Sequence, residues 1–573
     1  MLEKTRRWLA VHPNWTLALV TVAVLAPFLA KPFNIDDPLF IWVAQQIYLH
    51  PANPYGFDVN WVQTVFPMWN ATENPPLACY YLALAAGFFG WSEIGLHAAF
   101  LLPALAVVLG THRLAGHFCK HPMLAALAML FTPVFMVSGL TVMCDMLMLA
   151  FWVWAAVLWV EGMERDDYGR LAVSGLLIAF AVLTKYYGAC LMPLLGAYGL
   201  LCKRRPGRWM VYLLIPLATL YAYQVATLSL YGHNLLFRAA EYTSSFTAFL
   251  KGNYGHSQTA TVLAALTFTG GCVAVAAFFA PLLWRRRSLI GFGGAAVLIA
   301  AVVAHSSAIE KDLAASPWTS PAFVTFQIAV WAVAGLGVLA LAIADIVQRR
   351  DARSLLLVLW VLGTFSFTAF FNWTINGRSI LPMTPAVGIL IARRLEKNFP
   401  AGHKVWSRGV VIGLAASAAL SLLVARADFL FARAVRESAR ETCSELRTPG
   451  RTLWFEGHWG FQYYMEQSGA SAINLANPAL EPGDTFVVPA NNANLHSPRL
   501  NISAPREIIT VPKSRFLATM EGSVGAGFYA SLTGPLPFAF GRVPPEQVVV
   551  FSFTGLIPTP APAIPSQTIP PKN

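Results

Sequence analysis

The sequence predicts a mainly α-helical protein that crosses a membrane about 13 times and carries a small external α/β domain near its C-terminal end. Of its 573 residues, 56% are hydrophobic and only 12% are charged, whereas soluble globular proteins carry about 25% charged residues. The mean hydropathy is +0.55. Near residue 426 the long apolar runs give way to short ones, and this change predicts the separate domain.

Apolar runs long enough for membrane helices recur along the first part of the chain. A bilayer crossing needs about 20 mostly apolar residues. Candidate spans occur at 15–32, 94–112, 121–139, 146–161, 171–187, 189–202, 209–230, 259–284, 288–305, 322–347, 354–371, 376–392 and 408–425. The first run follows Lys4, Arg6 and Arg7 as a signal peptide would, but it ends without a small-residue cleavage site. We therefore expect it to be retained as a helix.

Basic residues gather in alternate loops between these runs. Clusters at 203–205, 285–287 and 349–353 fall on one side of the predicted membrane, and few Lys or Arg residues fall on the other. The positive-inside rule makes the basic side cytoplasmic. We expect a multi-pass protein of a bacterial cytoplasmic (inner) membrane, with a cytoplasmic N-terminus and a periplasmic C-terminal domain. The net charge of +12 then reports topology and indicates no nucleic-acid partner.

The first external loop, residues 33–93, contains two further apolar stretches. Residues 77–90 form a run that is shorter than the roughly 17 residues a crossing needs. Counting this run as a span would also move every later basic cluster to the outside, so we expect a juxtamembrane or re-entrant helix. Residues 37–48 place Leu39, Phe40, Val43 and Ile47 at helical spacing, which predicts a helix along the membrane surface.

The sequence divides into a membrane domain at 1–425, an external α/β domain at 426–557 and a Pro-rich disordered tail at 558–573. Within the external domain, runs of β-branched and aromatic residues predict short buried strands near 451–455, 484–488, 506–511 and 547–553. A short helix is expected at 460–468. The seven cysteines show no paired spacing, so we expect no disulfide framework, no metal site and no cofactor.

Two adjacent carboxylates, Asp36 and Asp37, end the first apolar run. Acids at a membrane boundary are costly unless they have a function or a partner. The predicted topology puts other polar side chains on the same external side. These candidates are Glu73, Asp145, Lys185, Tyr186, His256 and Arg378.

Several of these candidates also have a purely structural interpretation. Asp145 opens a helix, where Asp is a preferred cap, and Lys185 ends one, where a lysine can extend toward the interface. Glu73 and His256 fit ordinary polar loop positions. Arg378 is different, because a guanidinium at a helix start opposes the helix dipole and is a good phosphate ligand.

The candidate set has the chemistry needed to transfer a group from a phosphate-linked lipid. A carboxylate can take a proton from an acceptor hydroxyl as a general base. Lysine and arginine can stabilise the charge that grows on a departing phosphate. A monophosphate leaving group can be neutralised by such cations without a metal ion.

These residues resemble the GT-C superfamily, close to the bacterial glycosyltransferase families 39 and 83, which include aminoarabinose transferase and the protein O-mannosyltransferases. The matching elements, in the family's order, are the acidic pair 36–37, Glu73-Asn-Pro-Pro-Leu, Asp145, Thr184-Lys185, Gly255-His256 and Arg378 before Leu381-Pro382. The resemblance covers roughly residues 15–400. Asn74 stands where aminoarabinose transferase has a lysine, so the resemblance names neither the sugar nor the acceptor.

The resemblance implies an inverting transfer of a sugar from a polyprenyl-phosphate donor to a lipid, glycan or protein acceptor outside the membrane. It implies that Asp36 is the base, that the other acids position sugar or acceptor, and that Lys185, His256 and Arg378 hold the lipid phosphate. One alternative is a transporter or flippase of lipid-linked saccharides, which would show inverted repeats and charges near mid-membrane. Another is a membrane scaffold, for which Asp36 would have no role.

Overall fold

The computed structural model describes residues 12–72, 74–254, 258–305, 313, 315–399, 406–493, 495 and 500–556. The chain forms two compact units. The first contains Met1–Phe57, Pro67–Arg433 and Pro512–Pro545, and the second contains Asp58–Phe66, Ala434–Val511 and Glu546–Asn573. The division into a membrane domain and an external domain that the sequence suggests stays a prediction.

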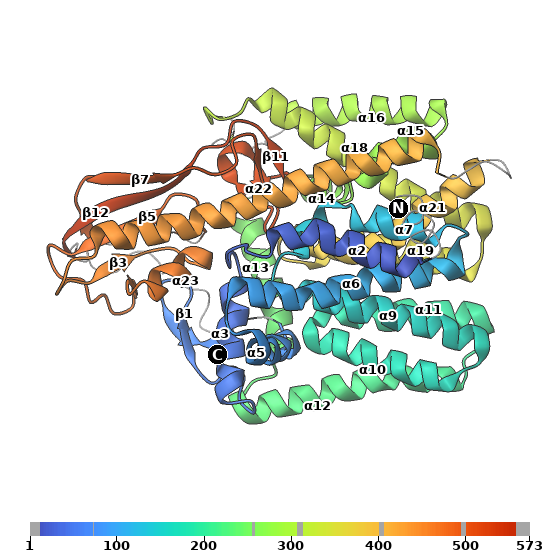
Figure 1. Ribbon diagram of the computed structural model, residues 1–573, viewed down its shortest axis with the longest axis horizontal. Helices are drawn as coiled ribbons and strands as arrows, with labels where there is room; N and C mark the ends of the chain where they lie inside the picture. The colour runs from blue at the N-terminus through green and yellow to red at the C-terminus, as the bar shows by residue number, and fades with distance from the viewer. Residues whose placement is uncertain are drawn as a thin grey trace, which may run out of the picture. The chain divides into compact units, whose positions relative to one another are not determined.

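Helices build the first unit (Figure 1). They are α2 Pro13–Leu25, α3 Asp37–Leu49, α4 Met68–Ala71, α5 Leu77–Phe89, α6 Glu93–Phe118, α7 Pro122–Leu130, α8 Pro133–Ser138, α9 Cys144–Arg165, α10 Tyr168–Thr184, α11 Leu191–Lys203, α12 Leu214–Tyr231, α13 Leu235–Tyr254, α14 Gln258–Cys272, α15 Val275–Leu283, α16 Arg286–His305, α18 Pro321–Arg349, α19 Ala352–Ser366, α20 Gly377–Ile380 and α21 Thr384–Asn398. The long α22, Arg408–Leu446, has residues in both units.

Within the described residues, seven helices are long and apolar enough to cross a membrane, or eight if the bent pair α14 and α15 counts as one span. The helical, multi-pass character predicted from the sequence is confirmed at this level. The more exact expectation of about 13 spans stays a prediction. Shorter apolar helices, Pro13–Phe28 and Tyr168–Thr184, occupy two of the other predicted spans.

Three runs that the sequence presents as continuous are divided in the structure. The run 121–139 splits into α7 and α8, where Thr132 caps the new helix by accepting a hydrogen bond from the Phe135 N–H at 3.4 Å. The run 376–392 splits into α20, a 3₁₀ turn and α21, with prolines at both restarts. Proline lacks a backbone N–H and favours a helix start. The run 259–284 is bent by 83° between α14 and α15.

The segment 33–93, which the sequence predicts to be an external loop, forms both of the helices that its pattern predicts. Helix α3 begins at Asp37 and α5 begins at Leu77, and the two pack against each other. A proline follows the first residue of α3, where its fixed φ angle suits a helix start. The acidic pair therefore lies at the N-terminal end of α3.

Helix α9 lies between α6 and α10 in the first unit (Figure 1). Its Trp152 and Trp159 side chains are buried. The Ser174 hydroxyl of α10 donates a hydrogen bond to the Ala155 carbonyl at 2.8 Å, and small residues of this kind let membrane helices approach closely. Near its two ends the helix carries two buried acids, Asp145 and Glu161, and each is paired with a basic side chain of a neighbouring segment.

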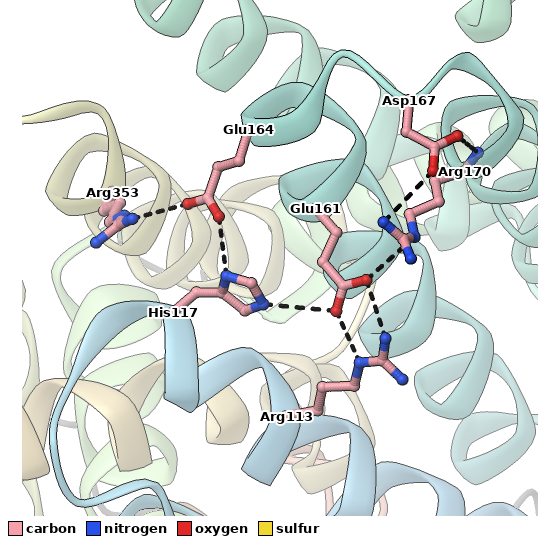
Figure 2. Close-up of polar contacts among 7 residues, drawn as sticks. All are labelled: Arg113, His117, Glu161, Glu164, Asp167, Arg170 and Arg353. Carbon is pink, nitrogen blue, oxygen red and sulfur yellow. Dashed lines mark hydrogen bonds and ion pairs between the residues drawn. The ribbon is translucent and has the colours of Figure 1, made fainter.

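A carboxylate network surrounds the C-terminal end of α9 (Figure 2). Both oxygens of the buried Glu161 accept hydrogen bonds from Arg113, at 2.7 and 3.0 Å. His117 Nε2 and Arg170 Nε lie 3.5 and 3.4 Å from the same carboxylate. Glu164 binds His117 Nδ1 at 3.0 Å and Arg353 at 2.7 Å. This network joins α6, α9, α10 and α19 at the end predicted to be cytoplasmic.

The second unit contains a mixed sheet of order β4-β3-β5-β12-β6, with β7 also paired to β12. The strands are β3 Leu453–Phe455, β4 Ser471–Ala472, β5 Thr485–Pro489, β6 Leu500–Ile502, β7 Glu507–Val511 and β12 Glu546–Leu556, and the helix α23 spans Trp459–Gln467. β3 runs parallel to β4 and β5, whereas β12 is antiparallel to its neighbours. Ile473, Phe486 and Phe553 form its core cluster. The four predicted strands and the predicted helix correspond to β3, β5, β7, β12 and α23, whereas β4 and β6 are not predicted.

The segment 512–545 adds small hairpins to the first unit. β8 Leu517–Ala518 pairs with β11 Ala539–Phe540, and β9 Met520–Glu521 pairs with β10 Ala526–Gly527, both antiparallel. The Gln327 side chain of α18 exchanges two hydrogen bonds with the Phe540 backbone, at 2.9 and 2.7 Å. This segment therefore packs on the helices and contributes residues to the site.

Candidate active site

The two acids of the pair face different surroundings. Asp36 is the N-cap residue of α3, but its side chain makes no capping hydrogen bond. The preceding Ile35 has φ of 53°, an uncommon conformation for a β-branched residue that is found at turns and strained functional sites. The Asp36 carboxylate is 29% exposed and lies 2.9 Å from Nη1 of Arg378. Asp36 therefore faces the candidate site.

Asp37 is fully buried, and its carboxylate binds two backbone N–H groups from different segments. Its two oxygens accept hydrogen bonds from the N–H groups of Asn34 at 3.1 Å and Val142 at 3.0 Å. Burial raises the pKa of Asp37 to about 7, although the nearby Lys31 and the two N–H donors act in the opposite direction. Asp37 thus links the start of α3 to the segment that precedes α9.

Arg378 lies on the short helix α20, whose start is fixed by hydrogen bonds. The Asn376 side chain accepts a bond from the Ser379 N–H at 2.9 Å. The Gly377 N–H donates to the Phe528 carbonyl at 2.7 Å, and a Cβ at Gly377 would lie 2.6 Å from the Phe528 ring. Glycine is therefore required by this close approach, which sets the direction of the next residue, Arg378.

The Arg378 guanidinium contacts three groups. Besides Asp36, its Nη1 donates to the Met143 sulfur at 2.9 Å, and its carbon lies 5.9 Å from the centre of the Tyr529 ring, within cation–π range. Its buried Nε has no hydrogen-bond partner among the described residues. The guanidinium therefore keeps hydrogen-bonding capacity for a ligand.

Asp145 and Lys185 form the second ion pair. Lys185 Nζ lies 2.6 Å from Oδ1 of Asp145, with the lysine side chain 23% exposed and the aspartate 1% exposed. The other oxygen, Oδ2, is buried without a hydrogen-bond partner in the described part of the chain. Asp145 also lies within electrostatic range of Arg378. Charges thus alternate along Asp36, Arg378, Asp145 and Lys185, so Lys185 is a paired cation rather than one that extends to the interface.

Tyrosines from three segments gather beside Lys185. Tyr186 opens the 3₁₀ turn Tyr186–Cys190 and interacts with Tyr223 of α12 and with Tyr55. The Tyr55 hydroxyl donates to the Asn74 carbonyl at 2.8 Å. Of these, only Tyr186 is expected from the sequence, because Tyr55 and Tyr223 belong to no motif.

A buried cluster lies behind the acidic pair. Lys31 Nζ is 2.5 Å from Oδ2 of Asp428, and both side chains are almost fully buried. Asp428 also accepts hydrogen bonds from Thr519 at 3.0 Å and from the Tyr529 hydroxyl at 3.0 Å. Tyr529 thereby connects Asp428 to Arg378, whose guanidinium lies over its ring. The sequence gives no signal for this cluster, since its members come from distant segments.

The structure brings together four of the expected site residues, Asp36, Asp145, Lys185 and Arg378, with Asp37 and Tyr186 beside them. Glu73 and His256 lie outside the described residues. Within the described part of the chain, no group of three or more His, Cys, Asp or Glu side chains is arranged to hold a metal ion.

Comparison with known proteins gives a partial family match. Residues 73–228 match the family model described as dolichyl-phosphate-mannose-protein mannosyltransferase. This segment includes Asp145, Lys185 and Tyr186. The resemblance to GT-C glycosyltransferases expected from the sequence is thereby confirmed. No curated protein sequence matches the chain.

Three solved structures are similar to this chain at low identity and low TM-score. ArnT from Cupriavidus metallidurans bound to undecaprenyl phosphate is 15% identical, with 84% of this chain and 93% of that chain covered and a TM-score of 0.40. The oligosaccharyltransferase AglB from Archaeoglobus fulgidus, in complex with an inhibitory peptide and a dolichol-phosphate, is 12% identical. The match covers 81% of this chain and 65% of that chain, with a TM-score of 0.42. The arabinofuranosyltransferase AftD from Mycobacteria is 13% identical, with 96% of this chain and 40% of that chain covered and a TM-score of 0.37. At these scores the likeness supports no conclusion about the site.

Proposed function

We propose that the chain is an inverting glycosyltransferase that moves a sugar from a polyprenyl-phosphate donor to an acceptor on the external face of a bacterial cytoplasmic membrane. The observation that carries the proposal is the row of alternating charges, in which the partly exposed Asp36 is bound to Arg378 next to the Asp145–Lys185 pair. A base and two phosphate-binding cations are the groups that such a transfer needs.

The Asp36–Arg378 ion pair gives the reaction an order of events. In the structure the Asp36 carboxylate is held in an ion pair with Arg378 at 2.9 Å. A donor phosphate competes with Asp36 for Arg378, since guanidinium groups bind phosphate oxygens well. Once the phosphate has taken the guanidinium, Asp36 is released to accept a proton. The base is thus activated by the donor.

The transfer itself is a single displacement. Asp36 takes the proton of the acceptor hydroxyl as that oxygen forms its bond to the anomeric carbon of the sugar. The bond between that carbon and the phosphate oxygen breaks, and its electron pair stays on the polyprenyl phosphate. Arg378 and Lys185 stabilise the charge that grows there. One displacement inverts the configuration at the anomeric carbon.

The remaining residues position these groups. Asp145 holds the Lys185 ammonium at 2.6 Å, and Asp37 fixes the backbone from which Asp36 projects. We assign Tyr186 to the sugar or phosphate of the donor, because it follows Lys185 directly. By the resemblance, Glu73 would also position sugar or acceptor and His256 would bind the lipid phosphate.

The partial family match supports the nature of the donor. The description of that family names a dolichyl-phosphate sugar, and dolichyl phosphate is a polyprenyl-type carrier. The sugar, the acceptor and the length of the lipid are left open. A flippase of lipid-linked saccharides would need cations for the same phosphate, so the two functions must be separated by chemistry rather than by binding.

The test measures release of polyprenyl phosphate from radiolabelled polyprenyl-phosphate sugars by the purified protein in detergent. Wild type is compared with Asp36→Asn and with the matched control Asp166→Asn, whose carboxylate is 69% exposed and pairs with Lys203. We expect release by wild type and by the control, and a loss of about 10²- to 10⁴-fold in Asp36→Asn. No release from any donor, with labelled lipid still moved across liposome membranes, would favour the flippase.

A further inference from the structure

Phe528 and Ser531 hold the turn that carries Arg378 at two points. The Gly377 N–H donates a hydrogen bond to the Phe528 carbonyl at 2.7 Å, and the Ser531 N–H donates to the Ile375 carbonyl at 2.8 Å. The Ile375 N–H in turn donates to the Ser531 hydroxyl at 3.2 Å. All of these residues belong to the first unit. The backbone from which Arg378 projects is therefore fixed by a segment that lies far along the chain.

Tyr529 lies between these two contacts in the sequence, and its side chain is buried. The guanidinium carbon of Arg378 lies over the Tyr529 ring, 5.9 Å from the ring centre. An aromatic ring attracts a cation through the negative charge on its face. This contact uses none of the guanidinium N–H groups, which donate hydrogen bonds in the plane of the guanidinium. The ring therefore holds Arg378 while its donors remain available for a carboxylate or a phosphate.

The hydroxyl of Tyr529 is fixed by a buried ion pair. It lies 3.1 and 3.0 Å from the two oxygens of Asp428. The same carboxylate pairs with Lys31 and accepts a hydrogen bond from Thr519 at 3.0 Å. Lys31 and Asp428 are each 1% exposed. Because a buried ion pair is costly to break, this pair holds the tyrosine ring in one position.

The contact with the ring matters most when Arg378 changes partners. In the proposed order of events the donor phosphate displaces Asp36, which lies 2.9 Å from the Arg378 guanidinium in the structure. An arginine side chain has several rotatable bonds, and fixing it in one conformation costs free energy. A ring that holds the guanidinium before and after the exchange lowers that cost, so the phosphate binds more tightly.

We propose that Tyr529 is a positioning residue, whose ring keeps the Arg378 guanidinium directed at the donor phosphate. This role rests on the proposed function, in which Arg378 binds that phosphate. Asp428 and Lys31 contribute indirectly, by fixing the tyrosine hydroxyl. The alternative is that Tyr529 only fills space in the core. Its removal would then lower the stability of the protein, and any effect on phosphate binding would not depend on Arg378.

Binding of radiolabelled farnesyl phosphate to the full chain in detergent tests this role in a double-mutant cycle. Tyr529→Leu removes the ring, both from wild type and from Arg378→Gln. We expect Tyr529→Leu to weaken binding about tenfold in wild type. In Arg378→Gln we expect a further change of less than about twofold, because the guanidinium that the ring holds is absent. An equal factor in the two backgrounds, no weakening in wild type, or no binding by wild type would overturn the role.

Tyr464→Leu is the matched control. Tyr464 is 2% exposed, against 4% for Tyr529, and the Arg440 guanidinium carbon lies 5.6 Å from its ring centre. Tyr464 and Arg440 belong to the second unit, and neither is a candidate site residue. We expect Tyr464→Leu to bind farnesyl phosphate as wild type does. If it weakens binding as much as Tyr529→Leu, the effect is not specific to Arg378 and the role is overturned.

Tyr529→Phe is the conservative variant. It keeps the ring and removes the hydroxyl, and Asp428 retains Lys31 and Thr519 as partners. We expect it to restore most of the binding that Tyr529→Leu loses, leaving a weakening of about threefold that disappears in Arg378→Gln. If Tyr529→Leu does not fold, Tyr529→Phe takes its place in the cycle, and unchanged binding by Tyr529→Phe then overturns the role.

The binding measurement keeps this role separate from the transfer reaction. Farnesyl phosphate carries no sugar, so wild type can bind it even if no donor yields polyprenyl phosphate. Coupling between Tyr529 and Arg378 in such a protein would keep the positioning role and overturn the glycosyltransferase. Release of polyprenyl phosphate without that coupling would keep the glycosyltransferase and overturn the positioning role.

Discussion

The two ends of α9 carry networks built from the same kinds of side chain, and they differ in how fully their polar atoms are paired. At the C-terminal end both oxygens of Glu161 are bonded, to Arg113, His117 and Arg170. At the N-terminal end Asp145 uses one oxygen for Lys185, and its other oxygen has no hydrogen-bond partner among the described residues.

The difference separates a structural network from a candidate site. Buried polar groups in folded proteins are almost always hydrogen-bonded, and each exception needs an explanation. The fully paired network around Glu161 holds four helices together. The incomplete pairing of Asp145 and of the Arg378 Nε is what a site prepared for a ligand would show. Similar residue composition thus accompanies different roles.

The largest expected effect comes from removing the guanidinium of the incomplete network. We expect Arg378→Gln to lower kcat/KM for polyprenyl phosphate release by about 100-fold or more, since it removes a group that stabilises the leaving phosphate. The comparison variant is Arg353→Gln, which removes an arginine of the paired network that is 45% exposed. Equal activities for the two variants would break the comparison. Kinetics with one radiolabelled donor measure both.

A change of stability with pH is expected from Asp37. Burial raises its pKa to about 7, well above the value of about 3.9 in an unfolded chain. Between these values the folded protein holds a proton that the unfolded chain has lost, so stability falls as pH rises and the loss is complete above about 7. From pH 5 to pH 7 this amounts to about 2 kcal/mol.

Thermal unfolding at pH 5 and pH 7 measures that slope. Wild type should melt at a lower temperature at pH 7, and Asp37→Asn should show a smaller difference between the two pH values. If Asp37→Asn leaves the difference in melting temperature between pH 5 and pH 7 unchanged, the pH dependence comes from other groups. Asp36→Asn is the matched control, because it changes the neighbouring, partly exposed carboxylate.

Glu161→Gln tests the paired network by stability rather than activity. The substitution leaves the cations of Arg113 and Arg170 without their buried counter-ion. We expect a loss of about 2 kcal/mol, less than the 3–5 kcal/mol typical of fully buried pairs because both arginines reach solvent. Melting temperature and the transfer rate per folded molecule are measured together. A large drop in the transfer rate of Glu161→Gln with an unchanged melting temperature would show that the C-terminal end of α9 has a catalytic rather than a structural role.

The smallest effect is the coupling between Asp145 and Lys185. A double-mutant cycle with Asp145→Asn and Lys185→Met should give an interaction energy of about 1 kcal/mol in kcat/KM. The control cycle uses Asp166 and Lys203, an exposed pair, for which we expect a value near zero. Additive effects of Asp145→Asn and Lys185→Met would show that the first pair does not act as a unit.

The sequence predicts elements well where the signal is local. The helical spacing after Asp37 and the apolar run from Leu77 mark α3 and α5 because each pattern lies within one segment. The bends are harder to predict. Pro133 and Pro382 start new helices inside apolar runs, and the hydropathy of these runs is unaffected by where a helix stops.

The candidate site is predictable only in part, because local patterns do not show which distant residues come together. Asp36, Asp145, Lys185 and Arg378 follow from sidedness and from a family resemblance. The partners that hold them do not. Tyr529 contacts Arg378 from a distant segment. Asp428 contacts Lys31 across 397 residues, and no spacing rule joins such positions. Asp37 looks like the twin of Asp36 in the sequence, yet backbone hydrogen bonds give it a different role.

The enclosed position of α9 has a consequence for how the chain can vary. At about 1.5 Å and about 100° per residue, the step from Asp145 to Glu161 is about 24 Å along the axis and about 160° around it. One residue inserted between them would turn one carboxylate by about 100° relative to the other, so both could not keep their partners. We therefore expect the number of residues between the two acids of this helix to be the same in related chains.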